Sequence, residues 1–357
     1  MSNPYTSLSL DSKSYTEYEL AGLCFSKLAS FSLEPWEYSL YGFILHWISD
    51  EGFVTVKTSG STGKPKEIKI SKNAMIASAK LTGEFLKLQK GNKALLCLPV
   101  DFIAGKMMIV RAFVFGLDLI PTKPDGNPLK ENNECFDFAA MTPMQVFNIL
   151  EDEKGIGKLN NIKNLIIGGG EINKGLEDKL INLKNNTYHT YGMTETITHI
   201  ALKKINGNSK NEGFIALKNV WFEQDERDCL IVNAPHISDE KIITNDIVLL
   251  KSKMEFEFIG RYDNVINSGG IKIIPEIIEG KLSQFINQRF FVYGKPDEKL
   301  GEKTVLVIEG KPDIEIEKIL NKIQFSKYEK PKEIIFINQF VETGNGKINR
   351  KNTLLKT

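Results

Sequence analysis

The sequence has few cysteines and histidines, and their spacing excludes several kinds of site. Its 357 residues include four of each. The cysteines are far apart and form neither a Cys-x-x-Cys pair nor a spacing typical of zinc ligands, so a disulfide framework and a structural zinc site are not expected. The histidines show no spacing that indicates a metal site or a proton relay. We expect a reducing location, the cytoplasm.

An excess of charge of either sign is also absent. The chain has 46 lysines and arginines against 45 aspartates and glutamates, which gives a formal net charge of +1. Without a strong overall field, the protein is not expected to bind nucleic acid or an anionic membrane. Any anion must instead be bound by a local group of donors.

A long uninterrupted apolar run is missing too. The N-terminus is polar where a secretory signal would have a basic start and an apolar stretch. The segment 95–120 is the most apolar, but Asp101, Lys106, Arg111 and Asp118 interrupt it. Because charged residues are costly in a bilayer, we expect no membrane span and interpret this segment as buried strand and helix.

The first part of the chain shows helical apolar spacing followed by strand signals. A chain of 357 residues is long enough to favour more than one domain. We expect helices at 15–31 and 36–48, with Pro35 in the first turn of the second. Strands at 53–57 and 67–70 flank a loop rich in glycine and hydroxyl residues, and the following Ser71 is placed to cap a helix that runs toward residue 88.

The rest of the chain predicts an α/β fold with three parts. Short apolar runs that alternate with helical segments, from 94 to 190, indicate an α/β sheet. Strand runs separated by turns from 214 to 258 indicate an antiparallel, β-rich lobe. We therefore expect a large N-terminal domain, residues 1–262, made of α/β sheets and this lobe and shortened at its N-terminus. A small, mobile α+β domain, residues 263–357, follows it.

The glycine-rich loop is a candidate phosphate site. Its glycines let backbone N–H groups approach an anion, its hydroxyls donate hydrogen bonds and its lysines supply positive charge. A polar hairpin loop is the alternative. A Walker-type loop is excluded by the spacing, because Thr58 stands where that motif has its first glycine and Pro65 where it has a hydroxyl residue. The loop consists of Thr58, Ser59, Gly60, Ser61, Thr62, Gly63, Lys64, Pro65 and Lys66.

This loop resembles the signature of the acyl-adenylate-forming (AMP-binding) superfamily, which includes acyl- and aryl-CoA ligases, luciferases and adenylation domains of peptide synthetases. Four further segments match the family's motifs in the same order. Any one match would be weak evidence, but five in order are specific. The four segments are Tyr191–Thr196 (YGMTET), Gly260–Asp263 (GRYD), Gly269-Gly270 with Lys272, and Gly346–Arg350 (GKINR).

The resemblance assigns ATP and Mg²⁺ to the second motif. Glu195 corresponds to a carboxylate that is suited to Mg²⁺, a cation that prefers oxygen ligands. Thr194 and Thr196 suit phosphate contacts, with Thr194 counted among the catalytic residues, and Tyr191 beside Gly192 offers a flat face for adenine. The alternatives are a solvated acid for Glu195 and a core residue for Tyr191.

Three further segments are implied to border the nucleotide or the acyl-adenylate. Asp246 stands where the family has an aspartate that binds the ribose hydroxyls, and Arg261 where an arginine assists it. The family has Thr-Gly-Asp before this aspartate, whereas here Asn245 replaces the glycine, and asparagine tolerates a left-handed backbone. The third segment, Gly168 to Glu171, is implied to border the acyl-adenylate through Gly169, Gly170 and Glu171, since glycine permits close backbone approach.

The remaining motifs imply that one domain rotates between the two half-reactions of the family. These are adenylation of the acid and transfer of the acyl group to a thiol. In the family, the small domain turns about the hinge aspartate, here Asp263. Lys347 then leaves the site where it serves adenylation, and the region of Gly269 and Gly270 enters to shape the thiol tunnel. A positioned cation would stabilise charge that develops at the α-phosphate. A solvated tail lysine is the alternative for Lys347.

The substrate is narrowed by a closer resemblance. Only 57 residues precede Thr58, and Leu98-Pro99 is followed by Ile103-Ala104-Gly105. Both features resemble the 2-succinylbenzoate–CoA ligases of menaquinone synthesis, although those ligases commonly have histidine where Phe102 stands. Their substrate keeps an unreacted carboxylate. Arg111 or Lys106 is expected to bind it, and a surface ion pair is the alternative for Arg111.

The resemblance thus implies a ligase that uses ATP, Mg²⁺, coenzyme A and a small carboxylic acid. Two enzyme alternatives stay open, another aryl- or acyl-CoA ligase and an enzyme that loads a carrier-protein thiol. A non-catalytic nucleotide-binding protein of the same fold is the third alternative. The sequence is compatible with a homo-oligomer and does not fix the oligomeric state.

Overall fold

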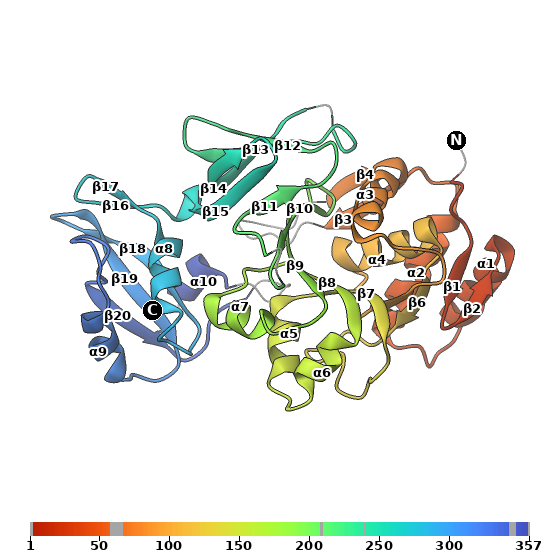
Figure 1. The fold of residues 1–357 in the computed structure, drawn as a ribbon, viewed down its shortest axis with the longest axis horizontal. Coiled ribbons are helices and arrows are strands. Elements are labelled where there is room, and N and C mark those ends of the chain that lie inside the picture. Colours follow the sequence, from red (N-terminus) through yellow and green to blue (C-terminus); the bar gives the residue numbers. More distant parts are fainter. Residues whose placement is uncertain (1–2, 58–66, 208–209, 239, 343–347, 356–357) are drawn as a thin grey trace.

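The structure is a computed structural model that describes residues 3–57, 67–207, 210–238, 240–342 and 348–355. In this part of the chain, the largest element is a sheet of 13 strands. A smaller sheet of five strands lies in the C-terminal region, and β3 (Phe53–Lys57) pairs with β4 (Glu67–Ser71) as a separate hairpin. Figure 1 shows the C-terminal region, in blue, beside the large sheet and its helices.

A hairpin that the sequence analysis did not predict comes first. The strands β1 (Leu8–Leu10) and β2 (Lys13–Tyr15) are antiparallel, and β1 also pairs in parallel with β6 (Asp118–Pro121). The two turn residues, Asp11 and Ser12, have φ of 50° and 63°. Asp118 fixes this turn, since its carboxylate accepts hydrogen bonds from the backbone N–H of Ser12 at 2.8 Å and from its hydroxyl at 3.0 Å.

The two expected N-terminal helices are confirmed, the first with shorter bounds and the second with almost the expected ones. The helix α1 spans Glu17–Leu28, and Thr16 and Glu19 form a capping box at its start. The helix α2 spans Pro35–Ile48, with proline in its first turn as expected. Ser71 caps α3 (Lys72–Leu86), also as expected, by accepting a hydrogen bond from the N–H of Ala74 at 3.1 Å.

The central part of the large sheet is parallel and covered on both faces. Its strands are β5 (Lys93–Leu96), β7 (Phe136–Met141), β8 (Ile162–Ile167) and β9 (Asn186–Gly192), together with β6. Alternate strand residues, such as Leu95 and Leu96, belong to two separate hydrophobic cores. Strands buried on both faces are expected to be continuously apolar, which is why these runs were recognisable.

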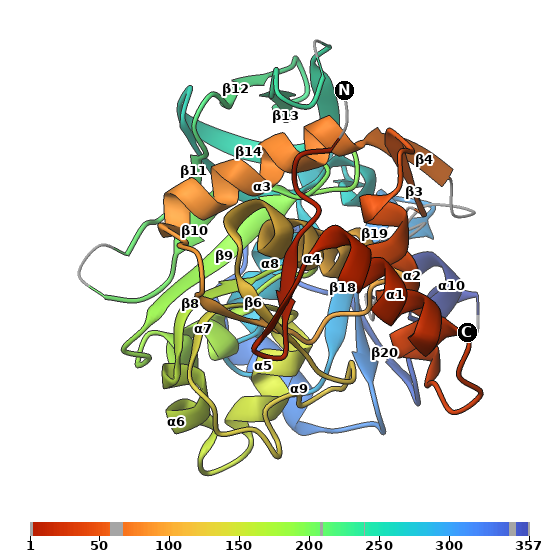
Figure 2. The same cartoon turned by 90° about the vertical axis from the view of Figure 1, so that its right-hand side faces the viewer.

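Helices that flank the sheet contribute side chains to the two hydrophobic cores, and Figure 2 shows these helices in a second view. The helices α3 and α4 (Ile103–Phe115) contribute to one core. The helices α5 (Pro143–Leu150), α6 (Gly155–Asn160) and α7 (Lys174–Leu180) contribute to the other. Eight of the thirteen residues of α4 are buried, including a charged one, Arg111. An apolar helix of this kind lies inside a domain rather than on its surface.

The β-rich part continues the same sheet. The strand β10 (His199–Lys204) is antiparallel to β9, so the sheet changes from parallel to antiparallel at this pair. The expected lobe is therefore one edge of the large sheet rather than a separate sheet. Its other strands, in sheet order, are β11 (Phe214–Ala216), β15 (Glu255–Arg261), β14 (Ile242–Ser252), β13 (Cys229–Asn233) and β12 (Trp221–Gln224).

The C-terminal region has the expected α+β composition and a hydrophobic core of its own. It begins after the short 3-10 helix η1 (Tyr262–Asn264). Its strands are β16 (Ile266–Ser268), β17 (Ile271–Ile273), β18 (Phe290–Asp297), β19 (Gly301–Glu309) and β20 (Glu333–Ile337). Its helices are α8 (Pro275–Leu282), α9 (Glu315–Lys322) and α10 (Arg350–Leu354). Within the described ranges, no helix is long and apolar enough to cross a membrane.

A buried lysine ties α3 to the end of α2. Lys72 is 4% exposed, and burial lowers the pKa of its amine. Its ammonium group donates to the carbonyl oxygens of His46, Trp47 and Ser49 at 2.8, 2.9 and 2.8 Å. These are carbonyls at the C-terminal end of α2, where intrahelical donors are lacking and the helix dipole favours a cation.

We predict that Lys72→Met lowers the free energy of unfolding by about 2–4 kcal/mol, because three buried or partly buried carbonyls lose a charged donor. Urea denaturation measures the change. Lys80→Met is the matched control, since Lys80 is an exposed lysine of the same helix. Equal losses in the two variants would contradict the capping role of Lys72.

Candidate active site

The described site residues gather where β8, β9 and β15 end, beside Asp246 of β14. Gly168 to Glu171 follow β8, and Tyr191 and Gly192 end β9, with Glu195 in the loop after it. The carboxyl ends of neighbouring parallel strands meet at one edge of a sheet, which is where such folds bind ligands. The expected phosphate loop (Thr58, Ser59, Gly60, Ser61, Thr62, Gly63, Lys64, Lys66) and Lys347 lie outside the described residues.

The loop after β9 is braced by Thr196. The Thr196 hydroxyl accepts a hydrogen bond from the N–H of Met193 at 2.9 Å and lies 2.8 Å from the carbonyl oxygen of Thr198. Thr196 is fully buried, so the expected phosphate contact of this residue is wrong. Ile197 has φ of 63°, a strained conformation for a β-branched residue, and its side chain is buried in the core.

Bracing leaves the two preceding residues at the surface of the site. Thr194 is partly exposed and Glu195 exposed. Within the described ranges, the Glu195 carboxylate has no recorded partner, and no group of three or more His, Cys, Asp or Glu residues could hold a metal. A lone carboxylate nevertheless suits Mg²⁺, which is often held by one or two carboxylates together with phosphate oxygens of the substrate. Glu195 therefore fits the proposed ion.

Asp246 connects β9 with the hinge strand. Its side chain is buried, and its two oxygens accept hydrogen bonds from the Tyr191 hydroxyl at 2.5 Å and from Arg261 at 2.7 Å. Asp246 and Arg261 are direct partners in the β14–β15 register. Burial, and next the charge of Asp246, raise the pKa of Tyr191 well above its usual value, so its hydroxyl stays a donor.

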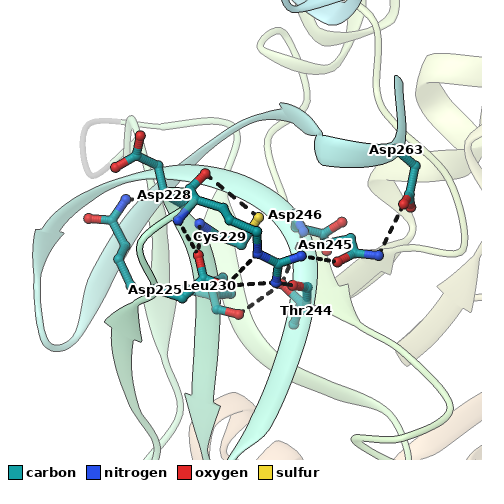
Figure 3. Close-up of polar contacts among 10 residues, drawn as sticks. Asp225, Asp228, Cys229, Leu230, Thr244, Asn245, Asp246 and Asp263 are labelled. Atoms are coloured by element: carbon teal, nitrogen blue, oxygen red, sulfur yellow. Dashed lines mark hydrogen bonds and ion pairs between the residues drawn. The ribbon is translucent and has the colours of Figure 1, made fainter. Parts of the chain in front are cut away.

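Asn245 links this group to the hinge residue. Its side-chain amide donates to Asp263 at 3.1 Å and accepts from Arg227 at 3.0 Å, as part of the contacts in Figure 3. Asn245 lies within β14 and its φ is not positive, so the tolerance of asparagine for a left-handed backbone is not needed here. The amide, and not conformational tolerance, is what this residue contributes. Arg261 also donates to Asp263, at 2.9 Å.

Arg227 is a member of this group that the sequence analysis missed. It lies in the segment 214–258, which the sequence analysis interpreted only as strands separated by turns. Asp225 accepts hydrogen bonds from its Nε and Nη2 atoms at 2.9 and 2.6 Å, and its guanidinium lies 5.0 Å from the centre of the Tyr262 ring. Nothing in the local sequence distinguishes such an arginine from a solvated one.

The glycine segment after β8 lies close to other backbone and to the small domain. A Cβ atom on Gly168 would lie 2.1 Å from the Thr190 hydroxyl, and Gly169 has φ of 82°. The pKa of His189 falls to about 4 because of burial, so its neutral ring donates Nε2–H to the carbonyl of Gly170 at 3.1 Å. The side chain of Glu171 keeps contact with solvent, but much of the space around its carboxylate is filled by protein. The resulting desolvation, and next the charge of Glu276, raise the pKa of Glu171.

The small domain contacts this side of the large sheet through α8. Glu276 is buried, Asn264 donates to its Oε1 atom at 2.6 Å, and its Oε2 atom has no partner in the described part. A Cβ atom on Gly260 would lie 2.5 Å from that Oε2 atom, so glycine permits this approach. Arg350, from the last motif, pairs with Glu279 of α8 at 2.9 Å. The described end of the lysine motif is thereby anchored on α8.

Gly269 and Gly270 form the turn between β16 and β17. Their φ values are 59° and 81°, and Ser268 pairs with Ile271. Positive φ at both central residues defines a tight hairpin turn in which glycine is favoured. This turn accounts for the two glycines structurally, and their part in a thiol tunnel stays a prediction.

The two candidate residues for the second carboxylate lie on different sides of α4. They are five residues apart, which separates them by about 140° on a helix. Lys106 donates to the backbone carbonyls of Val100 and Asp101. Arg111 is 1% exposed and donates to the Thr198 hydroxyl at 3.2 Å, and its Nε atom has no partner within the described ranges. The expected alternative of a surface ion pair is wrong for Arg111, which has no acidic partner among the described residues.

Comparisons with known proteins agree with this geometry. A family model described as AMP-binding enzyme matches residues 52–217. A solved acyl-CoA synthetase (AMP-forming)/AMP-acid ligase II-like protein from Dyadobacter fermentans is 37% identical, with a TM-score of 0.63, and the match covers 94% of this chain and 98% of that one. The chain therefore belongs to the family of AMP-binding enzymes.

Two other relatives carry a more particular name. The 2-succinylbenzoate–CoA ligase of Enterococcus faecalis is 25% identical over 328 residues, which are 82% of this chain and 67% of the relative. The o-succinylbenzoate CoA synthetase of Bacillus subtilis, solved with the acyl-adenylate intermediate OSB-AMP, has a TM-score of 0.76 over 98% of this chain and 95% of that one. At 15% identity, the second likeness shows the fold alone.

We predict that Asp246→Asn raises the KM for ATP about 10- to 100-fold, because Arg261 and the expected ribose contact would both lose a charged acceptor. Steady-state kinetics with varied ATP measure the effect. Asp228→Asn is the matched control, since Asp228 is an exposed aspartate of the same lobe whose positive φ asparagine tolerates. An unchanged KM for ATP would contradict the ribose role of Asp246.

Proposed function

We propose that this protein is an AMP-forming carboxylate–CoA ligase, and that its acid is 2-succinylbenzoate, activated for menaquinone biosynthesis. In the first half-reaction, a carboxylate oxygen bonds to the α-phosphorus of ATP and pyrophosphate leaves. In the second, the thiol sulfur of coenzyme A bonds to the acyl carbon, AMP leaves and the thiol proton passes to solvent. The family supports this reaction, and the names of the relatives support the acid.

The residues take the following roles in this proposal. The loop Thr58–Lys66 binds the phosphates, and Glu195 with Thr194 faces them from the loop after β9. Mg²⁺ held at Glu195 would neutralise charge on the triphosphate. Asp246, held by Tyr191 and Arg261, binds the ribose. Lys347 supplies the cation for adenylation.

The small domain is proposed to move as one body during this cycle. We place the boundary between residues 262 and 263, at η1, where Arg261 and Asn245 both contact Asp263. Rotation about Asp263 breaks no strand pairing of the large sheet, because β15 ends at Arg261. Such a movement lets one site serve two transition states. Gly269 and Gly270, at a turn of the moving domain, then approach the thiol.

The observation that carries the choice of acid is the buried guanidinium of Arg111. Burial lowers its pKa to about 9, and its described contacts are all uncharged: the Thr198 hydroxyl, the Met108 sulfur and the Phe138 ring. A buried cation without a counter-charge is costly, and the carboxylate of a ligand would relieve that cost. Because Lys106 is satisfied by two carbonyls on another side of α4, we assign the unreacted carboxylate to Arg111.

The test is a screen of carboxylic acids for pyrophosphate release with and without coenzyme A, followed by mass analysis of the products. We expect 2-succinylbenzoate to give an acyl-CoA. A thioester that forms on a carrier protein and not on coenzyme A would instead identify a carrier-loading enzyme. A different acid would keep the reaction and overturn the substrate, and release with no acid at all would overturn both.

We predict that Arg111→Met lowers the preference for 2-succinylbenzoate over 4-oxo-4-phenylbutanoate, the same molecule without the ring carboxylate, by about 100-fold. The preference is the ratio of the two kcat/KM values. Methionine fills a similar volume without charge, which limits cavity formation. Lys106→Met, on the same helix, is the comparison and leaves the preference unchanged. An unchanged preference in Arg111→Met would contradict the assignment.

A further inference from the structure

A continuous chain of hydrogen bonds lies behind Arg111 and joins three elements. Arg111 of α4 donates to the Thr198 hydroxyl at 3.2 Å. The Thr198 oxygen lies 3.4 Å from Nδ1 of His199, whose Nε2 atom lies 3.1 Å from the Thr82 hydroxyl of α3. Thr82 in turn donates to the carbonyl oxygen of Ser78 at 3.3 Å. His199 and Thr82 are buried, so the contact between them is shielded from water.

Only one direction of donation forms all four of these contacts as hydrogen bonds at the same time. A guanidinium can only donate, so the Thr198 oxygen accepts from Arg111 and its hydrogen is free for His199. At the other end, Thr82 spends its hydrogen on Ser78 and must accept from Nε2–H. His199 is therefore the Nε2–H tautomer, with Nδ1 as the acceptor of the Thr198 hydrogen.

His199 can play this part only as a neutral ring. Burial, and next the positive charge of Arg111, lower its pKa well below the usual value. A protonated ring would also remove the acceptor of the Thr198 hydroxyl and place a second cation beside the first. No described acid pairs with either group, so nothing in this part of the structure would offset the two charges.

Thr198 is the most exposed of the described side chains that contact the guanidinium of Arg111. Of the three side chains that contact the guanidinium in the described part, Met108 and Phe138 are fully buried, whereas Thr198 is partly exposed. Nε, which has no partner, and Nη1, which contacts only the Met108 sulfur, retain hydrogens for a carboxylate.

We propose that Thr198 and His199 are positioning residues that hold the guanidinium of Arg111 in one orientation and so determine the selectivity for an acid with a second carboxylate. The proposal rests on the proposed function, in which Arg111 binds that carboxylate. Thr198 anchors Nη2, and His199 anchors Thr198 to α3. The remaining N–H groups of Arg111 are then aimed before the ligand arrives, which reduces the ordering that binding requires.

The first experiment removes the Thr198 hydroxyl with little change of shape. We expect Thr198→Val to lower the preference for 2-succinylbenzoate over 4-oxo-4-phenylbutanoate about tenfold through the KM of the diacid, with kcat nearly unchanged, and Thr198→Ser to restore it. Thr187→Val is the matched control: Thr187 is a buried threonine of β9 whose hydroxyl donates to Asn185. Its loss changes stability and not the preference.

The second measurement addresses His199 without a binding assay. Nitrogen-15 NMR of the histidine rings, assigned by comparison with His199→Phe, is expected to show His199 neutral with the proton on Nε2 from pH 6 to 8. A protonated ring or the Nδ1–H tautomer at pH 7 would overturn the proposed positioning role of His199. This measurement uses the wild-type protein and does not require that Thr198→Val folds.

The outcomes separate this proposal from the proposed function. If the wild-type protein does not distinguish the two acids, or Arg111→Met retains the preference, the substrate assignment is wrong. The positioning role of Thr198 and His199 in selectivity is then wrong as well. If Arg111→Met abolishes the preference and Thr198→Val leaves it intact, only the positioning role is wrong. Equal effects of Thr198→Val and Thr187→Val on the preference would also overturn it, since they indicate a general loss of stability.

Discussion

The carboxylate of Asp246 is the interaction on which the arrangement of the site depends. It accepts one hydrogen bond from Tyr191 at the end of β9 and one from Arg261 at the end of β15. The first of these strands belongs to the parallel part of the sheet and the second leads into the small domain. A buried carboxylate with two strong donors fixes both ends relative to each other, because loss of Arg261 would remove its counter-charge and loss of Tyr191 would remove one of its two hydrogen bonds.

The architecture was predictable wherever apolar period and caps agree. Strands of the parallel sheet are apolar on both faces, and Ser71 and Pro35 mark helix starts by their own chemistry. The β1–β2 hairpin was not predictable, because its turn residues, Asp11 and Ser12, are not the usual glycine and asparagine. Their conformation is fixed by Asp118, more than a hundred residues away in the sequence. Long-range contacts of this kind leave no local pattern.

The site was predictable at the level of motifs and less so at the level of single side chains. Asp246, Arg261 and Tyr191 do come together, as the order of motifs implied. Thr196 faces the core because the loop folds back on its hydroxyl, and Asn245 acts through its amide. Arg227 and His199 were missed for a common reason: each acts through residues distant in sequence, Asn245 for the first and Thr82 for the second.

The N-terminal hairpin has a consequence for the exposed border of the large sheet. A parallel strand at such a border offers unpaired backbone groups to other chains, and β6 would hold that place if β1 were absent. With β1 added beside it, the outermost strand is β2, three residues long and containing Lys13. Short, charged borders are poor templates for intermolecular pairing. The hairpin thus covers an edge strand that could otherwise pair with strands of other molecules and promote aggregation.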